Sequence, residues 1–257
     1  MTELAGSVVM RATGVVKRFG GVAAVDGVSL DLRAGEVSAL IGPNGAGKST
    51  MMKLFTGEEH PDEGRIEIMG TDVTGFPPFK VSRQRLGRTY QSGRLIWSMT
   101  VMENLLLSPY PQVGDSFKGA LFGRKAAREQ ENRLIEQAYG VLDEVGLARM
   151  ANEPAGSLSG GQRRLVELGR LIMTGAELAV LDEPTAGLSP KMVELLEDVL
   201  RLLRSKGLGI LLVEHNMSLV ARLADRVTVM AFGKVIAEGT YQEIRADDGV
   251  KEVYLGV

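Results

Sequence analysis

The stretch Glu36–Phe55 limits what this chain can fold into more than any other part of the sequence. It opens with the apolar run Val37–Ile41, broken only by Ser38, which predicts a strand buried in a parallel sheet. A glycine-rich loop and a run of good helix formers follow directly, and this order of strand, loop and helix is the phosphate-binding P-loop. The loop and the first helical residues are Gly42, Pro43, Asn44, Gly45, Ala46, Gly47, Lys48, Ser49 and Thr50.

The chemistry of these residues suits a triphosphate. The loop glycines let successive backbone N–H groups turn into one concavity, and the start of the helix adds partial positive charge there. Lys48 is expected to reach the β- and γ-phosphates, and the Ser49 hydroxyl to complete the coordination of Mg²⁺. The stretch therefore predicts that the protein binds a nucleoside triphosphate.

Composition narrows the class of protein further. The chain has 257 residues, a formal charge of −2 and no cysteine. This charge gives no general attraction to nucleic acid or anionic lipid, and the lack of cysteine excludes disulfides and fits a reducing compartment. The N-terminus lacks the regions of a signal peptide, and no apolar run approaches the roughly 18 residues of a membrane span. We expect a soluble intracellular protein that contacts a membrane only through a partner.

Strand and helix patterns predict an α/β fold with a P-loop NTPase core. Several short strands in residues 8–41 alternate apolar and polar side chains, which favours an antiparallel β subdomain beside the P-loop strand. Near the other end of the chain, short apolar strands alternate with amphipathic helices. This alternation predicts a mostly parallel sheet with right-handed crossovers.

The middle of the chain has a different character. Residues 92–160 contain a loop rich in proline and glycine and then a long helical pattern from Arg124. We expect one domain over 1–257, in which residues 1–91 and 161–257 form the nucleotide-binding core. Residues 92–160 are predicted to be an inserted α-helical subdomain.

An apolar strand that begins at Glu177 ends in two carboxylates, Asp182 and Glu183. A strand buried on both faces must end before it can show charge, so these residues are expected at its carboxyl end, where ligands bind in open α/β sheets. Asp182 suits a partner of Mg²⁺, and Glu183 suits the general base that takes a proton from the attacking water. Without the P-loop, an acidic pair that simply faces solvent would be an open alternative.

The sequence Leu158, Ser159, Gly160, Gly161 and Gln162 carries a more specific resemblance. It resembles the LSGGQ signature motif of ABC-transporter ATPases, and it lies between a P-loop and an acidic strand, as in that family. On its own chemistry, Ser159 and the two glycines at a helix start suit anion capture, but a helix-capping turn explains Ser159 as well. The resemblance covers nearly the whole chain and implies the ABC ATPase fold, with ATP and Mg²⁺ as cofactors.

Three more residues match this family by position. Phe19 resembles the aromatic that stacks on the adenine ring, with a core aromatic beside a turn as the alternative. Gln91 resembles the Q-loop glutamine, which contacts Mg²⁺ and the attacking water and senses the transmembrane partner. His215 resembles the switch histidine that contacts the γ-phosphate. Glu183, His215 and Gln91 are therefore the expected catalytic residues, and Ser49, Gln91 and Asp182 the expected metal ligands.

The family resemblance also implies a dimer. In that family the signature motif of one subunit covers ATP held by the P-loop of the other, so the resemblance implies that neither subunit alone has a complete site. One departure lies at Ser189, where the family often has an aspartate in its D-loop. Ser189 cannot supply that carboxylate, so the hydrogen bonds that link the two ATP sites are expected to differ.

Several stretches outside the shared motifs are similar to the larger ATPase subunit of bacterial branched-chain amino acid importers: Arg18–Leu30, Gly87–Gln91, Met99–Leu107, 108–123 and Val253–Gly256. This similarity implies two integral-membrane permease subunits and a second ATPase subunit, in a heterodimer or a homodimer. It also implies an indirect partner, an extracytoplasmic solute-binding protein, and no nucleic acid. The expected location is cytoplasmic, on the inner face of the plasma membrane through the permeases.

Three other functions stay open within this family. The same branch serves importers of urea and short amides. An ATPase of a lipid or lipopolysaccharide exporter would differ only in its membrane partner. A soluble ABC ATPase that acts on nucleic acid or ribosomes would be expected to carry two cassettes, long coiled-coil insertions or strongly basic patches, which this chain lacks.

Overall fold

The computed structural model describes residues 6–89, 95–112 and 124–255. The chain divides into two compact units. The first, here called the core unit, comprises Met1–Arg88, Glu177–Ala186 and Leu200–Val257. The second, the helical unit, comprises Thr89–Ala176 and Gly187–Val199. Helix α7 (Pro190–Ser205) begins in the helical unit and ends in the core unit.

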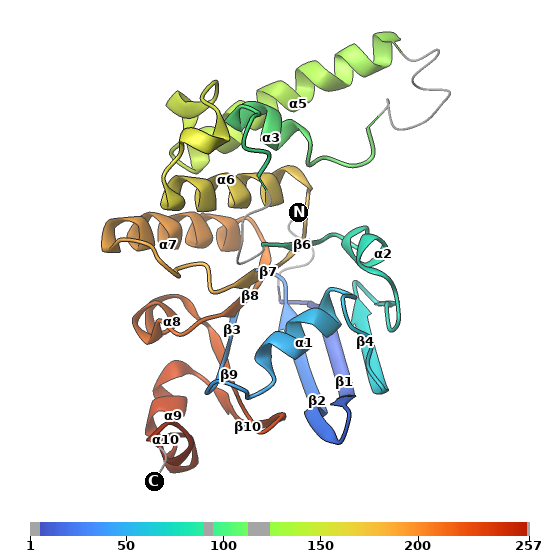
Figure 1. Cartoon of the computed structure of the whole chain (residues 1–257), viewed down its shortest axis with the longest axis vertical. Helices are drawn as coiled ribbons and strands as arrows, with labels where there is room; N and C mark the ends of the chain where they lie inside the picture. The colour runs from blue at the N-terminus through green and yellow to red at the C-terminus, as the bar shows by residue number, and fades with distance from the viewer. Residues whose placement is uncertain (1–5, 90–94, 113–123, 256–257) are drawn as a thin grey trace. The chain divides into compact units, whose positions relative to one another are not determined.

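A six-stranded sheet in the order β10-β9-β3-β8-β7-β6 forms the centre of the core unit (Figure 1). Every neighbouring pair is parallel except β9 and β10, which form an antiparallel hairpin. Strands β3 and β8 are buried along their whole length, which agrees with their apolar sequences, interrupted only by Ser38 in β3. The strands are β3 (Val37–Ile41), β6 (Leu86–Arg88), β7 (Leu178–Asp182), β8 (Gly209–Val213), β9 (Arg226–Ala231) and β10 (Lys234–Gly239).

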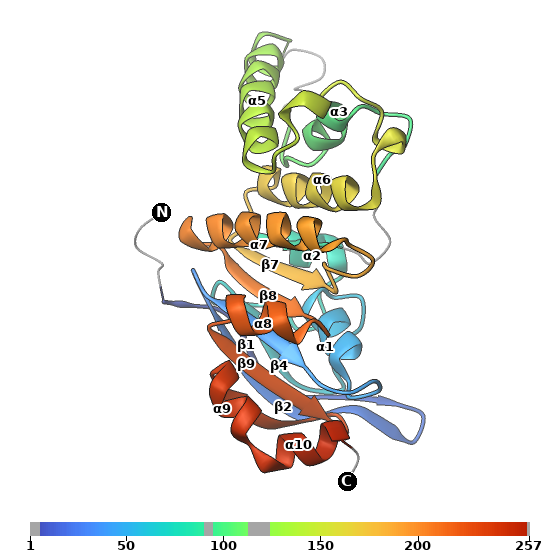
Figure 2. The same ribbon diagram turned by 90° about the vertical axis from the view of Figure 1, so that its left-hand side faces the viewer.

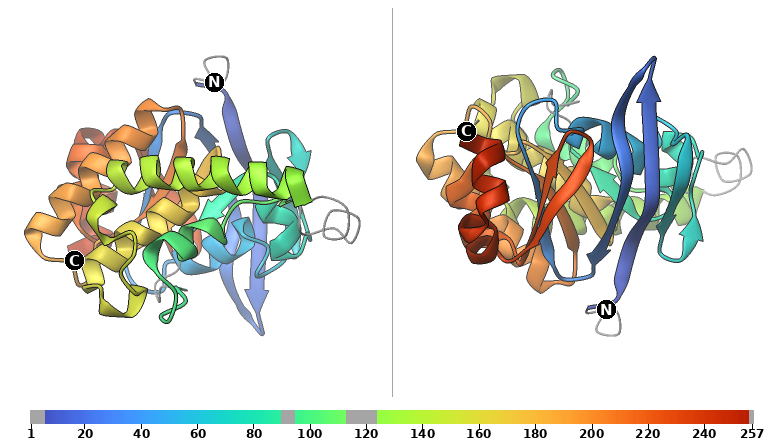
Figure 3. Two further views of the ribbon diagram at one scale, coloured as in Figure 1. Left: turned by 90° about the horizontal axis from the view of Figure 1, so that it is seen from above. Right: turned by 90° about the horizontal axis from the view of Figure 1, so that it is seen from below.

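A second sheet of the core unit is antiparallel, with the order β2-β1-β4-β5. Its strands are β1 (Val8–Phe19), β2 (Val22–Arg33), β4 (Glu63–Ile68) and β5 (Thr71–Asp72). The expectation of several short strands before the P-loop was wrong, because β1 and β2 are continuous strands of 12 residues each (Figure 3). The alternation breaks at shifts of the β1–β2 register, one of them at Gly14, where an irregular backbone lets the strand continue after its side chains change faces.

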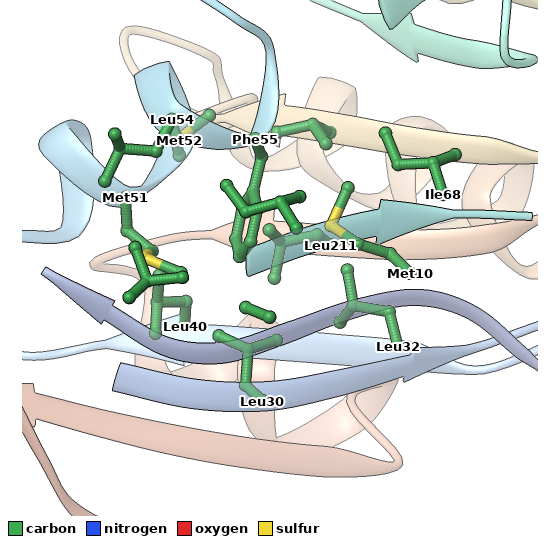
Figure 4. Packing of buried hydrophobic residues seen from close by; sticks show 14 of the residues in the cluster. Met10, Leu30, Leu32, Leu40, Met51, Met52, Leu54, Phe55, Ile68 and Leu211 are labelled. Carbon is green, nitrogen blue, oxygen red and sulfur yellow. The ribbon is translucent and has the colours of Figure 1, made fainter. Parts of the chain in front are cut away.

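A large hydrophobic cluster draws on both sheets and on helix α1 (Lys48–Phe55) (Figure 4). Phe55 is fully buried at the end of α1, with Met10 of β1 and Leu211 of β8 in the same cluster. Burial of one such side chain stabilises the fold by about 1.5–3 kcal/mol. The cluster therefore fixes α1, and with it the phosphate-binding loop, on the sheets.

Among the described residues, four more helices belong to the core unit: α2 (Pro78–Ser82), α8 (Met217–Leu223), α9 (Tyr241–Ala246) and α10 (Asp248–Leu255). Helix α9 packs against β9 and β10, and α10 packs against α9 and β10 (Figure 2). A small cluster that includes Ile41, Val229 and Ile244 fills this part of the core unit.

The helical unit contains α3 (Val101–Leu106), α5 (Arg124–Glu144), α6 (Gly160–Met173) and the beginning of α7. Helix α3 contacts both α5 and α6, with Leu105 and Leu142 fully buried. Short 3₁₀ turns at Ala148–Met150 and Ala155–Ser157 lead from α5 to α6. Within the described part of the chain, no helix combines the length and the apolar character needed to cross a membrane.

Candidate nucleotide-binding site

The P-loop lies between β3 and α1 and is packed tightly against two other strands. A Cβ atom at Gly42 would lie 2.1 Å from the carbonyl oxygen of Met230 in β9, and one at Gly47 would lie 2.3 Å from the carbonyl oxygen of Ala24 in β2. The φ angles of these glycines, 150° and 102°, also favour glycine. Both positions therefore exclude any side chain, and the backbone of the loop is held by its surroundings.

Helix α1 begins with free capacity to bind an anion. Its N-cap residue, Gly47, has no side chain to accept a hydrogen bond from the first-turn N–H groups, and the first turn contains no acidic residue. The loop N–H groups and the positive end of the helix dipole can therefore act on phosphate oxygens. The hydroxyl-bearing Ser49 is exposed in this first turn.

Lys48 is the buried cation of the site. Its ammonium donates hydrogen bonds to the carbonyl oxygens of Gly42 at 2.7 Å and Pro43 at 2.9 Å. Burial lowers the pKa of Lys48, and the carboxylates of Glu183 and Asp182 oppose this shift. The lysine is thus held inside the loop within the electrostatic reach of both carboxylates.

Asp182 and Glu183 lie at the carboxyl end of β7. Asp182 pairs with Val213, the last residue of β8, in the parallel register. Glu183 leaves the strand with a φ of 43°, which is uncommon for a residue with a side chain, while its N–H donates to the carbonyl oxygen of Val213 at 2.8 Å. This turn directs the chain away from β7 immediately after the two acidic residues.

His215 stands beside Glu183. Its Nε2 atom lies 3.2 Å from Oε1 of Glu183, and 48% of the imidazole is exposed. The pair is accessible, so its contribution to stability is small, at most about 1 kcal/mol. The pair matters for the geometry of the site. It places Glu183, the expected base, next to His215, the expected contact of the γ-phosphate, although the two residues follow different strands.

Glu214 is a residue of this site that the sequence interpretation did not select. Its carboxylate is buried, and Oε1 accepts hydrogen bonds from the N–H and the hydroxyl of Thr185 at 2.9 and 2.6 Å. Oε2 accepts from the N–H groups of His215 and Asn216 at 2.9 and 3.0 Å. Glu214 thus ties the loop after Glu183 to the loop that carries His215. The signal was present, since Glu214 is also a carboxylate directly after an apolar strand.

Replacing Glu214 with glutamine should therefore disturb the site more than the fold. The amide nitrogen must face N–H donors, which we expect to cost roughly 1–3 kcal/mol of unfolding free energy. Small displacements of Glu183 and His215 are expected to lower ATP turnover by up to about 10²-fold. Denaturant unfolding and steady-state ATPase assays measure the two effects. Glu197→Gln, which changes another buried glutamate, is the control. If Glu214→Gln lost turnover only in proportion to the fraction of unfolded protein, the role of Glu214 in positioning the site would be contradicted.

Phe19 ends β1 at the tip of the β1–β2 hairpin. The residue is 47% exposed, so the interpretation as a core aromatic was wrong, because the pairing of Phe19 with Val22 places both at the hairpin tip. The ammonium of Lys17 lies 5.5 Å from the centre of the ring. An accessible ring with a cation on one face can present its other face to a flat base.

The signature residues lie in the helical unit at the start of α6. Ser159 is the N-cap: its hydroxyl accepts from the N–H of Gln162 at 3.3 Å, and the amide oxygen of Gln162 accepts from the N–H of Ser159 at 2.9 Å. The capping role that was open for Ser159 is therefore present. Leu158 is buried, whereas Gly160 is exposed in the first turn. An exposed helix start without bulky side chains leaves backbone N–H groups accessible to an anion.

The residues expected to bind Mg²⁺ are suited to this ion. Mg²⁺ prefers oxygen ligands and commonly takes only one or two from the protein, the others coming from phosphate and water. The Ser49 hydroxyl and the Asp182 carboxylate supply such ligands in the core unit, and Asp182 acts electrostatically on Lys48, the residue next to Ser49. Gln91, the third expected ligand, lies outside the described residues.

Fold and site together define a class of protein: a P-loop ATPase cassette with an antiparallel β sheet and a helical unit that carries a signature motif. Residues 25–186 match the family model described as ABC transporter. The chain belongs to the ABC transporter family and is the nucleotide-binding ATPase subunit of such a transporter. Residues 234–257 match a second model, described as branched-chain amino acid ATP-binding cassette transporter.

Individual relatives agree with this assignment. The chain is 39% identical over 249 residues to a high-affinity branched-chain amino acid transport ATP-binding protein of Pseudomonas aeruginosa, covering 96% of this chain and 98% of the relative. It is 36% identical over 252 residues to a probable branched-chain amino acid transport ATP-binding protein of Methanocaldococcus jannaschii, covering 96% and 97%.

Solved structures show the same fold. One is the ADP conformation of an ATP-binding cassette of an ABC transporter, with a TM-score of 0.83, 35% sequence identity and coverage of 97% of this chain and 99% of the other. Another is a nucleotide-free ATP-binding cassette from an ABC transporter, with a TM-score of 0.80 and 35% identity over 97% of this chain and 100% of the other. Each supports the predicted ABC ATPase fold.

Proposed function

We propose that this ATPase powers the import of branched-chain amino acids, or related small amino acids, through permease partners. The observation that carries this proposal is the similarity, over 96% of the chain, to proteins named for branched-chain amino acid transport. The match of residues 234–257 to a model specific for such transporters supports it independently, because the shared ATPase motifs lie elsewhere.

In this proposal the site residues take the following roles, which their positions support. Lys48 and the loop N–H groups bind the β- and γ-phosphates, and Phe19 supports the base. Ser49 and Asp182, with Gln91, would hold Mg²⁺, which neutralises phosphate charge when bound. Glu183 accepts a proton from the attacking water, and His215, 3.2 Å away, orients its carboxylate and contacts the γ-phosphate.

The second half of the site comes from a neighbouring ATPase subunit in this proposal. Leu158, Ser159, Gly160, Gly161 and Gln162 of each subunit cover the ATP of the other. Residues 92–160 act as the helical subdomain, which moves when the dimer closes and pushes on two integral-membrane permeases. The protein then works on the cytoplasmic face of the membrane, and a solute-binding protein delivers substrate from outside.

Reconstitution tests this function. The chain is combined in proteoliposomes with candidate permeases, its partner ATPase subunit and the binding protein, and the uptake of leucine, isoleucine and valine is measured with and without ATP. We expect these amino acids to stimulate both uptake and ATP hydrolysis. Stimulation by urea or short amides alone would identify the other importers, and transport of lipid or lipopolysaccharide outward would identify an exporter. Activity on nucleic acid or ribosomes without permeases would contradict a transport role.

A further inference from the structure

Phe232 is an exposed aromatic residue in a strained turn of the core unit. The β9–β10 hairpin closes through Phe232 and Gly233, whose φ angles are 50° and 78°. A two-residue turn with both φ angles positive is the type I′ geometry, which strongly prefers Asn-Gly, and phenylalanine is poorly suited to its first position. Phe232 is also 85% exposed. Neither the turn nor burial explains a phenylalanine here.

The other non-glycine residues with positive φ among the described ones each have an explanation nearby. Met69 packs against the hydrophobic cluster around Phe55, Arg85 pairs with Glu177, and Glu183 is the expected base beside His215. Backbone strain that no nearby packing or pairing compensates is found mainly at functional positions. Phe232 combines such strain with an apolar side chain that the fold leaves in solvent.

The turn is joined directly to the phosphate-binding loop. The N–H of Gly233 donates to the carbonyl oxygen of Ala46 in the P-loop at 3.1 Å, and its carbonyl oxygen accepts from the N–H of Asp26 in β2 at 2.8 Å. Lys234 reinforces this contact with an ion pair to Asp26 at 3.2 Å. Phe232 is thus one residue away from backbone that touches both the P-loop and β2.

The same stretch of β2 begins beside Phe19 at the hairpin tip and reaches the P-loop at Ala24. Gly47 abuts the carbonyl oxygen of Ala24, and Val22, 69% exposed, pairs with Phe19 at the hairpin tip. A nucleotide with its phosphates in the P-loop and its base on Phe19 must pass its sugar along this edge. A Cβ at Gly233 would lie 3.1 Å from the carbonyl oxygens of Ala23 and Ala24, so the β9–β10 turn lies against that edge too.

We propose that Phe232 is a nucleotide-binding residue that contacts the nucleoside part of the bound nucleotide, beside the exposed apolar residues Phe19 and Val22. Contact between an exposed aromatic ring and a sugar or base is favourable, because it removes apolar surface of both partners from water. This inference rests on the proposed binding of nucleotide at the P-loop. It assigns to the β9–β10 turn a contact with the nucleoside and leaves the phosphates to the loop.

Phe232→Asn tests the proposal, since it creates the Asn-Gly sequence that the turn prefers and should leave thermal stability unchanged or raised. Calorimetric titrations of the protein with ADP and with inorganic tripolyphosphate separate the two parts of the ligand. We expect the affinity for ADP to fall about 3- to 10-fold, with the affinity for tripolyphosphate unchanged. Phe232→Tyr, which keeps the aromatic face, should bind ADP as the wild type does.

Phe79→Asn, at another exposed phenylalanine of the core unit, is the matched control and should bind ADP normally. Unchanged ADP affinity in Phe232→Asn would overturn the inference, even if the variant dimerised poorly, because Phe232 would then belong to a subunit contact. Equal losses for ADP and tripolyphosphate would also overturn it, since the turn would then only hold the phosphate loop. Failure of the wild type to bind ADP would instead overturn the proposed nucleotide site itself.

Discussion

Glu183→Gln is expected to lower ATP turnover by about 10²- to 10⁴-fold while ATP binding is kept, because glutamine cannot accept the proton of the attacking water. The variant should accumulate as an ATP-dependent dimer, since ATP closes the dimer but hydrolysis, which normally reopens it, does not follow. Steady-state phosphate release measures the loss of turnover. Size-exclusion chromatography with light scattering, with and without ATP, measures the dimer.

Two features of the structure make this substitution a clean test. Glutamine keeps the size of the side chain, and the pair with His215 that it weakens is an exposed one. The matched control is Glu177→Gln, immediately before the opposite end of β7, where the carboxylate pairs with Arg85. The control should hydrolyse ATP normally. Turnover retained in Glu183→Gln would remove Glu183 as the base.

Lys48→Ala is expected to abolish detectable nucleotide binding at ordinary concentrations. The variant loses a buried ammonium that the loop holds through two carbonyl oxygens, and the phosphates would then lack their charged partner. Loss of one member of a buried charge pair costs about 2–5 kcal/mol, which is roughly a 30- to several-thousand-fold rise in Kd. Calorimetry with ATP measures it, and Lys53→Ala, at the exposed lysine of the last turn of α1, should bind normally.

Ser159→Arg should behave in the opposite way and keep ATP binding while it loses hydrolysis. The substitution affects the start of α6 in the helical unit, whereas the residues that bind the phosphates lie in the core unit. Loss of the cap costs α6 only about 1 kcal/mol, so the fold should remain. Ser205→Arg adds the same charge at an exposed serine and serves as the control. Equal loss of ATP binding in Lys48→Ala and Ser159→Arg would contradict a site shared between two subunits.

The contiguous motifs of this chain can be interpreted from local sequence. A strand, a glycine loop and a lysine–serine pair occur within one stretch, Glu36–Phe55, and the structure forms β3 and α1 on either side of that loop. The acidic residues after β7 and the helix after Ser159 are predictable on the same local grounds. Such features depend on backbone geometry and chemistry within a few residues, and a short stretch of chain contains all of the groups involved.

Other features depend on partners that are distant in the chain. Glu214 joins two loops of the site through its hydrogen bonds to Thr185, 29 residues earlier. The turn at Phe232 gained its place beside the P-loop through the contact between Gly233 and Ala46. The local sequence around either residue does not identify its partner, because the order of the strands in the sheet decides which loops meet.

The sequence by itself therefore determined that this protein binds a nucleoside triphosphate, that it has an α/β fold, and that its motifs resemble those of ABC-transporter ATPases. Tertiary structure alone decided how the site is held: Met230 and Ala24 enclose the P-loop, and Glu214 joins the loops of Glu183 and His215. The physical reason is that a motif specifies the groups that act on a ligand. Their rigid placement comes from packing and hydrogen bonds between strands that only the folded chain brings together.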